Sequence, residues 1–328
     1  MIDYRAYGLI RHGSTLGTAA RSREGRGSRP HHGKPILPGI RQRECPTTDP
    51  PAVDILAPIR PARPWLVGHV PHAATLIPPG ERSRLRLDDE ALAAELLRIT
   101  DRHTDRLFAW VRELGGVMVV NRVSRLVVDP ERFPDDADEP MAVTGQGAVY
   151  TRTTHGLPLR DAGPTERRRL LDTWYEPYHA ALAGVVETAV ASSGRCLLLD
   201  GHSFATSPLP SEPDRSPDRP DVCLGTDPVH TPPGLAADLR AALEAEGFRV
   251  ELDRPFAGTL VPRPWYGVDR RVTSIMLEVR RGTYMDEGTG EPLPGLGDVA
   301  ARLRMAVAQV LTAGGWPPDP IGGAPRRL

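Results

Sequence analysis

Residues 196–203 read CLLLDGHS, an apolar run that ends in an aspartate and is followed at once by glycine, histidine and serine. A short, continuous apolar run is typical of a strand that is buried on both faces, as in a parallel sheet. Comparable runs are WLVGHV at 65–70, VMVV at 117–120 and TSIMLEV at 273–279. We therefore predict that these segments build a largely buried β-sheet.

Between these runs, apolar residues recur at the spacing of a helix. The predicted helical segments are 87–114, 164–192, 232–248 and 299–311. The second of them contains Pro177, which predicts either one long helix or a pair of helices. The alternation of strands and helices predicts an α/β fold with a mostly parallel, mixed sheet flanked by helices.

Charge divides the chain into a tail and a folded part. Residues 1–64 hold 11 basic and 5 acidic residues and show no sustained periodicity, which predicts a disordered or poorly ordered, basic Pro/Arg-rich tail. Whether this tail belongs to the native protein stays open at this point. Residues 65–314 are predicted to form a single α/β domain, and residues 315–328 a flexible C-terminal tail.

The overall composition excludes several classes of protein. The chain carries 41 Lys+Arg and 42 Asp+Glu, a balance that argues against binding to nucleic acid or to anionic membranes. It has no apolar run long enough to cross a membrane and no secretory signal, and its three cysteines are too few for a disulfide framework. We expect a cytoplasmic protein of unknown oligomeric state.

Polar residues suited to metal binding follow the predicted strands. His72 comes just after the strand at 65–70, and His202 just after CLLLD. In open α/β sheets, ligands bind beyond the carboxyl ends of the strands, so these side chains are expected at one edge. Imidazole nitrogens suit Zn²⁺, and hydrolases commonly add a carboxylate as third ligand.

The carboxylate could come from the segment 87–114. Asp101 and Asp105 lie four residues apart and would share one face of a helix. An ordinary solvated helix face is the alternative interpretation of this pair. Glu278, near the end of the last strand, could act as the general base for a water molecule whose pKa a metal has lowered. It could equally form a structural ion pair with the arginines that follow it.

At these residues the sequence resembles the N-formylglutamate amidohydrolase family, which is grouped with the zinc-dependent carboxypeptidase-like hydrolases. The elements that carry the resemblance occur in the family's order between about residues 65 and 290. They are HVPHAATLIP (69–78), TDRHTDRLF (100–108), NRVSRLVVDPERFPDD (121–136), WYEPYHAAL (174–182), LLLDGHS (197–203), LGT (224–226), RPFAGT (254–259) and LEVRRGTYMDE (277–287).

The resemblance implies a phosphorylase/hydrolase-like, zinc-exopeptidase-like fold and a single bound Zn²⁺. His72 and His202 resemble the histidine ligands, and the carboxylate ligand is expected to be Asp101, with Asp105 as the alternative. Glu278 resembles the catalytic glutamate. The implied reaction is hydrolysis of the amide of an N-acyl amino acid, with N-formyl-L-glutamate giving L-glutamate and formate.

A substrate with two carboxylates needs fixed cations, and the guanidinium fork suits carboxylates through paired hydrogen bonds. The candidates are Arg122, Arg125, Arg132 and Arg281. Since 40 of the 41 basic residues are arginines, an isolated arginine is weak evidence of function. For Tyr178 and His179, which also match a family element, we expect structural hydrogen bonds.

The sequence departs from the family pattern where Ala73 and Ala74 stand in place of the usual Ser-Gly after the histidine. This leaves open a non-catalytic member that binds an acidic ligand, or a related peptidase or amidase. In the tail, LIRHGST (9–15) is similar to the Arg-His-Gly element of histidine phosphatases. The partner histidine and glutamate elements do not follow it, so we assign His12 no role.

Overall fold

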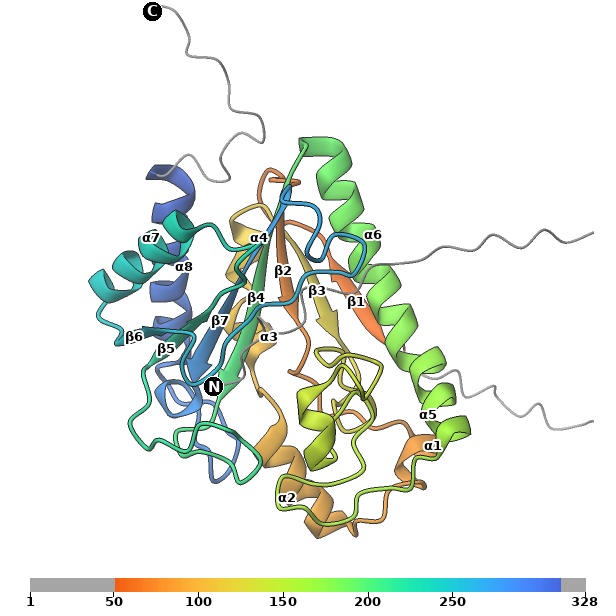
Figure 1. Cartoon of the computed structure of the whole chain (residues 1–328). Coiled ribbons are helices and arrows are strands. Elements are labelled where there is room, and N and C mark those ends of the chain that lie inside the picture. Colours follow the sequence, from red (N-terminus) through yellow and green to blue (C-terminus); the bar gives the residue numbers. More distant parts are fainter. Residues whose placement is uncertain (1–50, 314–328) are drawn as a thin grey trace, which may run out of the picture.

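The structure, a computed structural model, describes residues 51–313. A seven-stranded sheet forms its centre, with the strand order β1-β3-β2-β4-β7-β5-β6 (Figure 1). The strands are β1 Val53–Leu56, β2 Leu66–Val70, β3 Val117–Asn121, β4 Cys196–Phe204, β5 Val222–Gly225, β6 Val250–Leu252 and β7 Val272–Arg280. The central strands β3, β2, β4 and β7 are mutually parallel, whereas β1 and β5 run antiparallel to β3 and β7. The predicted mixed α/β fold is confirmed.

The edge strand β1 corrects the predicted start of the folded part at residue 65. Residues 53–56 pair with residues 118–121 and extend the sheet beyond β3. Periodicity missed this strand because its side chains are mostly half-buried or exposed, as edge strands often are. Residues 1–50, with His12, and the C-terminal residues 314–328 lie outside the described part of the chain.

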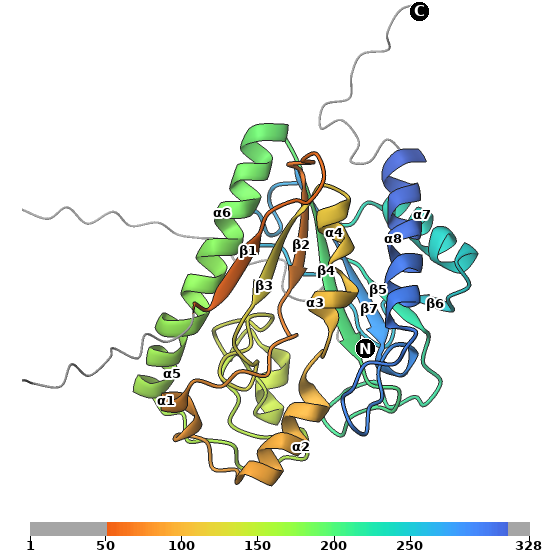
Figure 2. The same ribbon diagram turned by 180° about the vertical axis from the view of Figure 1, so that it is seen from behind.

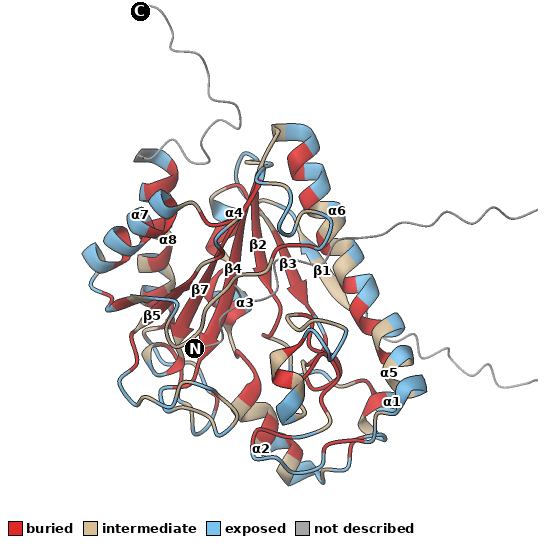
Figure 3. Cartoon of the chain, in the orientation of Figure 1, coloured by how far each residue is buried: buried red, intermediate tan, exposed pale blue. Residues whose placement is uncertain are grey.

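Helices cover both faces of the sheet (Figures 1 and 2). They are α1 Pro79–Arg82, α2 Asp89–Ile99, α3 Thr104–Leu107, α4 Trp110–Glu113, α5 Pro164–Leu170, α6 Glu176–Ser193, α7 Pro233–Ala245 and α8 Leu296–Ala313. One core joins α3, α4, α7 and α8 to one face, and a second core joins α6 to the other. The central strands are therefore buried on both sides, as Figure 3 shows. Within residues 51–313, no helix combines the length and the apolar character that crossing a membrane requires.

The predicted helix 87–114 is broken into three short helices, α2, α3 and α4. The break lies at residues 100–103, where His103 adopts a left-handed conformation with φ of 67°. The amide of Asp101 donates to the carbonyl of His72 at 3.0 Å instead of to the preceding turn. This long-range bond ends α2 and brings Asp101 to the end of β2, which no local pattern could indicate.

The segment 164–192 forms one long helical run that contains a π-helical turn, the first of the two alternatives predicted. A π-helical turn at Leu171–Tyr175 joins α5 to α6 just before Pro177. Since proline lacks the N–H that a regular turn would use, a widened turn here accommodates it. The buried residues of α6 include Tyr178, Leu182 and Val186, four residues apart, and they face the sheet.

Gly225 lies where β5 meets the loop that follows β6. A Cβ atom at this position would approach the carbonyl oxygen of Gly258 to 2.1 Å and Cε of Met276 to 2.4 Å. Because a backbone atom blocks the space, we expect Gly225→Ala to lower the free energy of unfolding by about 1–3 kcal/mol. Urea denaturation measures this. Gly184→Ala in α6 is the control, since a Cβ there meets nothing within 4 Å; equal stability of the two variants would contradict the prediction.

Candidate functional site

Strand register gathers polar side chains on the face of the sheet that α6 covers. His69 of β2 is paired with Asp200 of β4, and His202 of β4 is paired with Glu278 of β7. Because side chains alternate along a strand, Asp200 and His202 point to the same face. His202 therefore lies inside β4, which is longer than the predicted strand 196–200, and not in a loop beyond it.

His72, Asp101 and His202 form a buried group at the ends of these strands. Oδ2 of Asp101 lies 3.6 Å from Nδ1 of His72 and 3.3 Å from Nδ1 of His202. The two imidazole rings have centroids 5.0 Å apart. The structure thus brings together three of the four predicted ligands. It does not bring Asp105 to them: this residue is exposed on α3, and its carboxylate accepts from the amide of Arg106.

Both histidines are anchored through their other ring nitrogen. Nε2 of His72 is 2.8 Å from Oδ1 of Asp129, and Nε2 of His202 is 2.9 Å from Oδ1 of Asp200. With Nε2 of each imidazole donating to its carboxylate, Nδ1 is the ring nitrogen that remains for a metal ion beside Asp101. Carboxylate–histidine pairs of this kind orient metal ligands in many proteins.

Sequence reasoning missed Asp129 and Asp200. Asp129 ends the apolar stretch SRLVVD (124–129), and Asp200 ends CLLLD, so both sit where a buried run meets the site. A buried carboxylate directly after an apolar run was the signal that could have identified them.

Asp101 is held by Arg281, which was predicted to bind substrate. Nη2 of Arg281 donates to Oδ1 of Asp101 at 2.8 Å, Nε donates to Oγ of Ser203, and Nη1 donates to the carbonyl of Arg98. Burial raises the pKa of Asp101, but the neighbouring imidazoles of His202 and His72 and the charge of Arg281 bring it well below its ordinary value. Arg281 is therefore occupied in fixing an ionised carboxylate.

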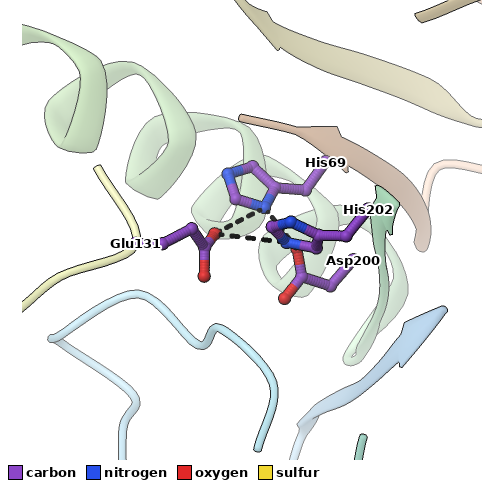
Figure 4. Close-up of side chains that lie close together, drawn as sticks. All are labelled: His69, Glu131, Asp200 and His202. Atoms are coloured by element: carbon purple, nitrogen blue, oxygen red, sulfur yellow. Dashed lines mark hydrogen bonds and ion pairs between the residues drawn. The ribbon is translucent and has the colours of Figure 1, made fainter. Parts of the chain in front are cut away.

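A second group of possible ligands shares His202 with the first (Figure 4). It consists of His69, Glu131, Asp200 and His202. Nδ1 of His69 lies 2.7 Å from Oδ1 of Asp200, the same oxygen that accepts from His202. Because the nitrogens of this group already have hydrogen-bond partners, it forms a network that supports the histidines.

The first group offers the better fit to a metal ion. Among the described residues, Nδ1 of His72 is buried without a hydrogen-bond partner, although buried polar atoms are normally paired. Two imidazole nitrogens and one carboxylate oxygen are also a donor set that Zn²⁺ prefers. The residues present therefore fit a single divalent ion.

Glu278 lies beside this group on β7. It is buried, and its Oε2 has no hydrogen-bond partner among the described residues. Burial raises the pKa of Glu278 to about 8, while His202 and Arg281 act in the opposite direction. A carboxyl group with a pKa near neutrality suits a role in which it accepts and returns a proton.

The remaining candidate arginines differ in their partners and in their distance from the site. Nε and Nη2 of Arg125 both donate to Oδ2 of Asp129, so this guanidinium supports the anchor of His72. Arg132 has a donor that could bind a ligand: its Nε has no hydrogen-bond partner among the described residues and is 3.8 Å from Oδ2 of Asp129. Arg122 is half exposed at the β1 edge and pairs with Asp54 at 3.2 Å, so the structure does not bring it to the site.

Tyr178 and His179 make hydrogen bonds, as expected from the sequence. The hydroxyl of Tyr178 bonds with Nε2 of His69, and Nε2 of His179 is 2.9 Å from the carbonyl of Pro130. Both residues lie on α6, so this helix ties the sheet face to the segment that carries Glu131.

Fold and site together define an α/β protein with a candidate metal-binding group at the ends of its central strands. The chain belongs to the N-formylglutamate amidohydrolase family, whose model matches residues 64–285. N-formylglutamate deformylase of Pseudomonas aeruginosa is 33% identical over 252 residues, which cover 74% of this chain and 92% of that protein. The N-formylglutamate deformylase of Pseudomonas putida is 32% identical over 227 residues, 67% of this chain and 82% of that protein.

Solved structures agree with this placement. The crystal structure of N-formylglutamate amidohydrolase from Ralstonia eutropha matches with a TM-score of 0.68 and 26% identity, over 80% of this chain and 99% of that one. A gene product of Agrobacterium tumefaciens matches with a TM-score of 0.53 and 17% identity, over 79% of this chain and 96% of that one, and shows likeness of fold.

Proposed function

We propose that the protein hydrolyses N-formyl-L-glutamate to L-glutamate and formate with one Zn²⁺, and that its fold belongs with the zinc exopeptidases. The unpartnered Nδ1 of His72, which faces Oδ2 of Asp101 beside Nδ1 of His202, is the observation that carries this proposal. The two deformylases at 33% and 32% identity support the substrate.

His72, Asp101 and His202 would hold the ion. When bound, Zn²⁺ polarises a carbonyl group and lowers the pKa of water. Glu278 takes a proton from the attacking water and passes it to the nitrogen of the leaving amine. Arg132 binds a carboxylate of the substrate, and Arg125 and Arg281 keep Asp129 and Asp101 ionised and in place.

Metal content measured together with formate release tests the proposal. Purified active protein should contain close to one equivalent of zinc, and a chelator should remove both the metal and the activity. Activity in protein that holds less than about a tenth of an equivalent of any divalent ion would refute the metal-dependent mechanism.

Replacing Arg132 tests its contact with substrate. A hydrogen bond to a charged group contributes about 1.5–3 kcal/mol, so Arg132→Gln should raise KM for N-formyl-L-glutamate about 10- to 100-fold with a smaller change in kcat. Arg122→Gln is the matched control, because Arg122 lies at the sheet edge. Steady-state kinetics of both variants decide, and an unchanged KM in Arg132→Gln would show that this guanidinium does not bind substrate.

The hydrogen bonds that link Tyr178 through His69 and Asp200 to His202 should affect the affinity for the metal ion. Burial lowers the pKa of His69, so its ring is neutral and its Nε2 accepts from the hydroxyl of Tyr178 while Nδ1 donates to Asp200. Tyr178→Phe leaves Nε2 of His69 unpaired and loosens Asp200. We expect about tenfold weaker zinc affinity, measured in competition with a chelator. Replacing a residue that hydrogen-bonds to a metal ligand commonly weakens metal binding about 10- to 100-fold, and Tyr178 is one step further from the ligand.

Thr273→Val is the control for Tyr178→Phe. It also removes a buried hydroxyl, but that hydroxyl donates to the carbonyl of Cys196 at 3.0 Å, at the start of β7 and away from the proposed ligands. Equal zinc affinity of the two variants would show that the hydrogen bonds made by His69 do not influence the metal ligands.

A further inference from the structure

The proposed substrate carries two carboxylates, whereas the arginines found so far supply one cation for it. Arg125 and Arg281 are engaged with Asp129 and Asp101, and Arg122 lies away from the site. Arg132 alone of these four retains an unpaired buried Nε. A second cationic group for the other carboxylate is therefore expected from a different segment, and the described residues offer a candidate.

The loop between β6 and β7 reaches the site from a different direction. It crosses the α6 side of the sheet (Figure 1), where Leu260, Val261 and Trp265 pack in the core that contains Tyr178. The amide of Leu260 donates to Oδ2 of Asp200 at 2.9 Å. The carboxylate that anchors His202 therefore also fastens this loop, shortly before the loop presents Arg263.

Arg263 is held next to the segment that carries Arg132. Its guanidinium carbon lies 5.3 Å from the ring centroid of Tyr175, and the hydroxyl of Tyr175 donates to the carbonyl of Arg132 at 2.9 Å. The ring of His179 lies tilted against the same ring, with centroids 4.1 Å apart, and its Nε2 is 2.9 Å from the carbonyl of Pro130. One aromatic ring thus separates Arg263 from the backbone of Arg132.

The charge of Arg263 is available to a ligand. Its side chain is 52% exposed, and the carboxylate in ion-pairing range that the described chain offers is Glu176, at 3.9 Å and 51% exposed. A pair so distant and so exposed contributes little, because solvent screens it. Contact with the ring of Tyr175 limits the motion of the guanidinium.

We propose that Arg263 binds the side-chain carboxylate of the substrate, while Arg132 binds the α-carboxylate. Arg132 follows Glu131, whose Oε1 lies 3.4 Å from His69 and 3.8 Å from the metal-ligand candidate His202. The α-carboxylate is the nearer of the two to the scissile amide, and so it belongs with Arg132. Arg263 lies against the ring of Tyr175, whose hydroxyl bonds to the backbone of Arg132, and we assign it the carboxylate farther from the scissile amide. This assignment rests on the proposed function.

Paired substrates test the assignment. Formate release is measured with N-formyl-L-glutamate and with N-formyl-L-glutamine, which has the same shape without the side-chain charge. Arg263→Gln should lower kcat/KM for the glutamate substrate about 10- to 100-fold and leave the glutamine substrate within about twofold. The preference for glutamate should fall by the same factor.

Arg304→Gln is the matched control. Arg304 on α8 is 43% exposed and faces Glu113 at 3.9 Å, a pairing like that of Arg263 but on the other face of the sheet. Its replacement should leave the preference unchanged. Zinc content and thermal unfolding of both variants confirm that the fold is intact.

Three results would overturn the assignment. The preference stays the same in Arg263→Gln; the glutamine substrate loses as much as the glutamate substrate; or 4-formamidobutanoate, which lacks the α-carboxylate, is hydrolysed equally by the variant and the wild type. In each case the wild type still hydrolyses N-formyl-L-glutamate, and only the role of Arg263 fails. If the wild type releases no formate from N-formyl-L-glutamate, the proposed function fails and the assignment falls with it.

Discussion

Asp101→Asn is expected to weaken zinc binding more than about 100-fold, beyond the range for the outer partners of metal ligands, and to reduce formate release to background. The reason is geometric, since Oδ2 of Asp101 lies between Nδ1 of His72 and Nδ1 of His202. Asparagine keeps the volume and an acceptor for Arg281 but removes the anionic donor. Metal analysis after dialysis, together with formate release, measures the effect.

Asp105→Asn is the control for Asp101→Asn. Asp105 was the alternative ligand on sequence grounds, but it is exposed and lies on α3. Its replacement should leave zinc content and activity near those of the wild type. Full zinc occupancy in Asp101→Asn, or loss of zinc in Asp105→Asn, would show that the ion is held elsewhere.

Glu278→Gln is expected to lower kcat about 10²- to 10⁴-fold, the usual contribution of a general acid or base, with zinc content near normal. Glutamine has the same shape but cannot accept the proton of the attacking water. Burial raises the pKa of Glu278 to about 8, so in the metal-free protein the folded state disfavours the ionised form. At pH 7 an unfolded glutamate is ionised, hence removing the charge should leave the metal-free protein equally stable or more stable.

The combination of lost turnover with retained metal and stability distinguishes a proton carrier from a structural residue. Glu291→Gln, at an exposed position after β7, is the control and should keep wild-type kinetics. A Glu278→Gln protein that turns over at the wild-type rate would remove Glu278 from the mechanism. A variant that loses zinc would instead point to Glu278 as a ligand.

The sequence by itself determined the central sheet and two of the three proposed metal ligands. Strands β2, β3, β4 and β7 were predictable because each is buried on both faces and therefore contains a run of apolar residues. His72 and His202 were predictable because parallel strands bring their carboxyl ends to one edge. These inferences need only local composition and one rule of topology.

The tertiary structure decided which carboxylate faces the histidines and which arginines stay free. Asp101 and Asp105 are alike in local sequence, and the choice between them depends on the amide of Asp101 bonding to the carbonyl of His72, which ends α2. Likewise, we propose different roles for Arg281 and Arg132 because Arg281 donates to Asp101, whereas Nε of Arg132 has no hydrogen-bond partner among the described residues. Partners distant in sequence set the charge and the free donors of each group, so a chain read residue by residue cannot reveal them.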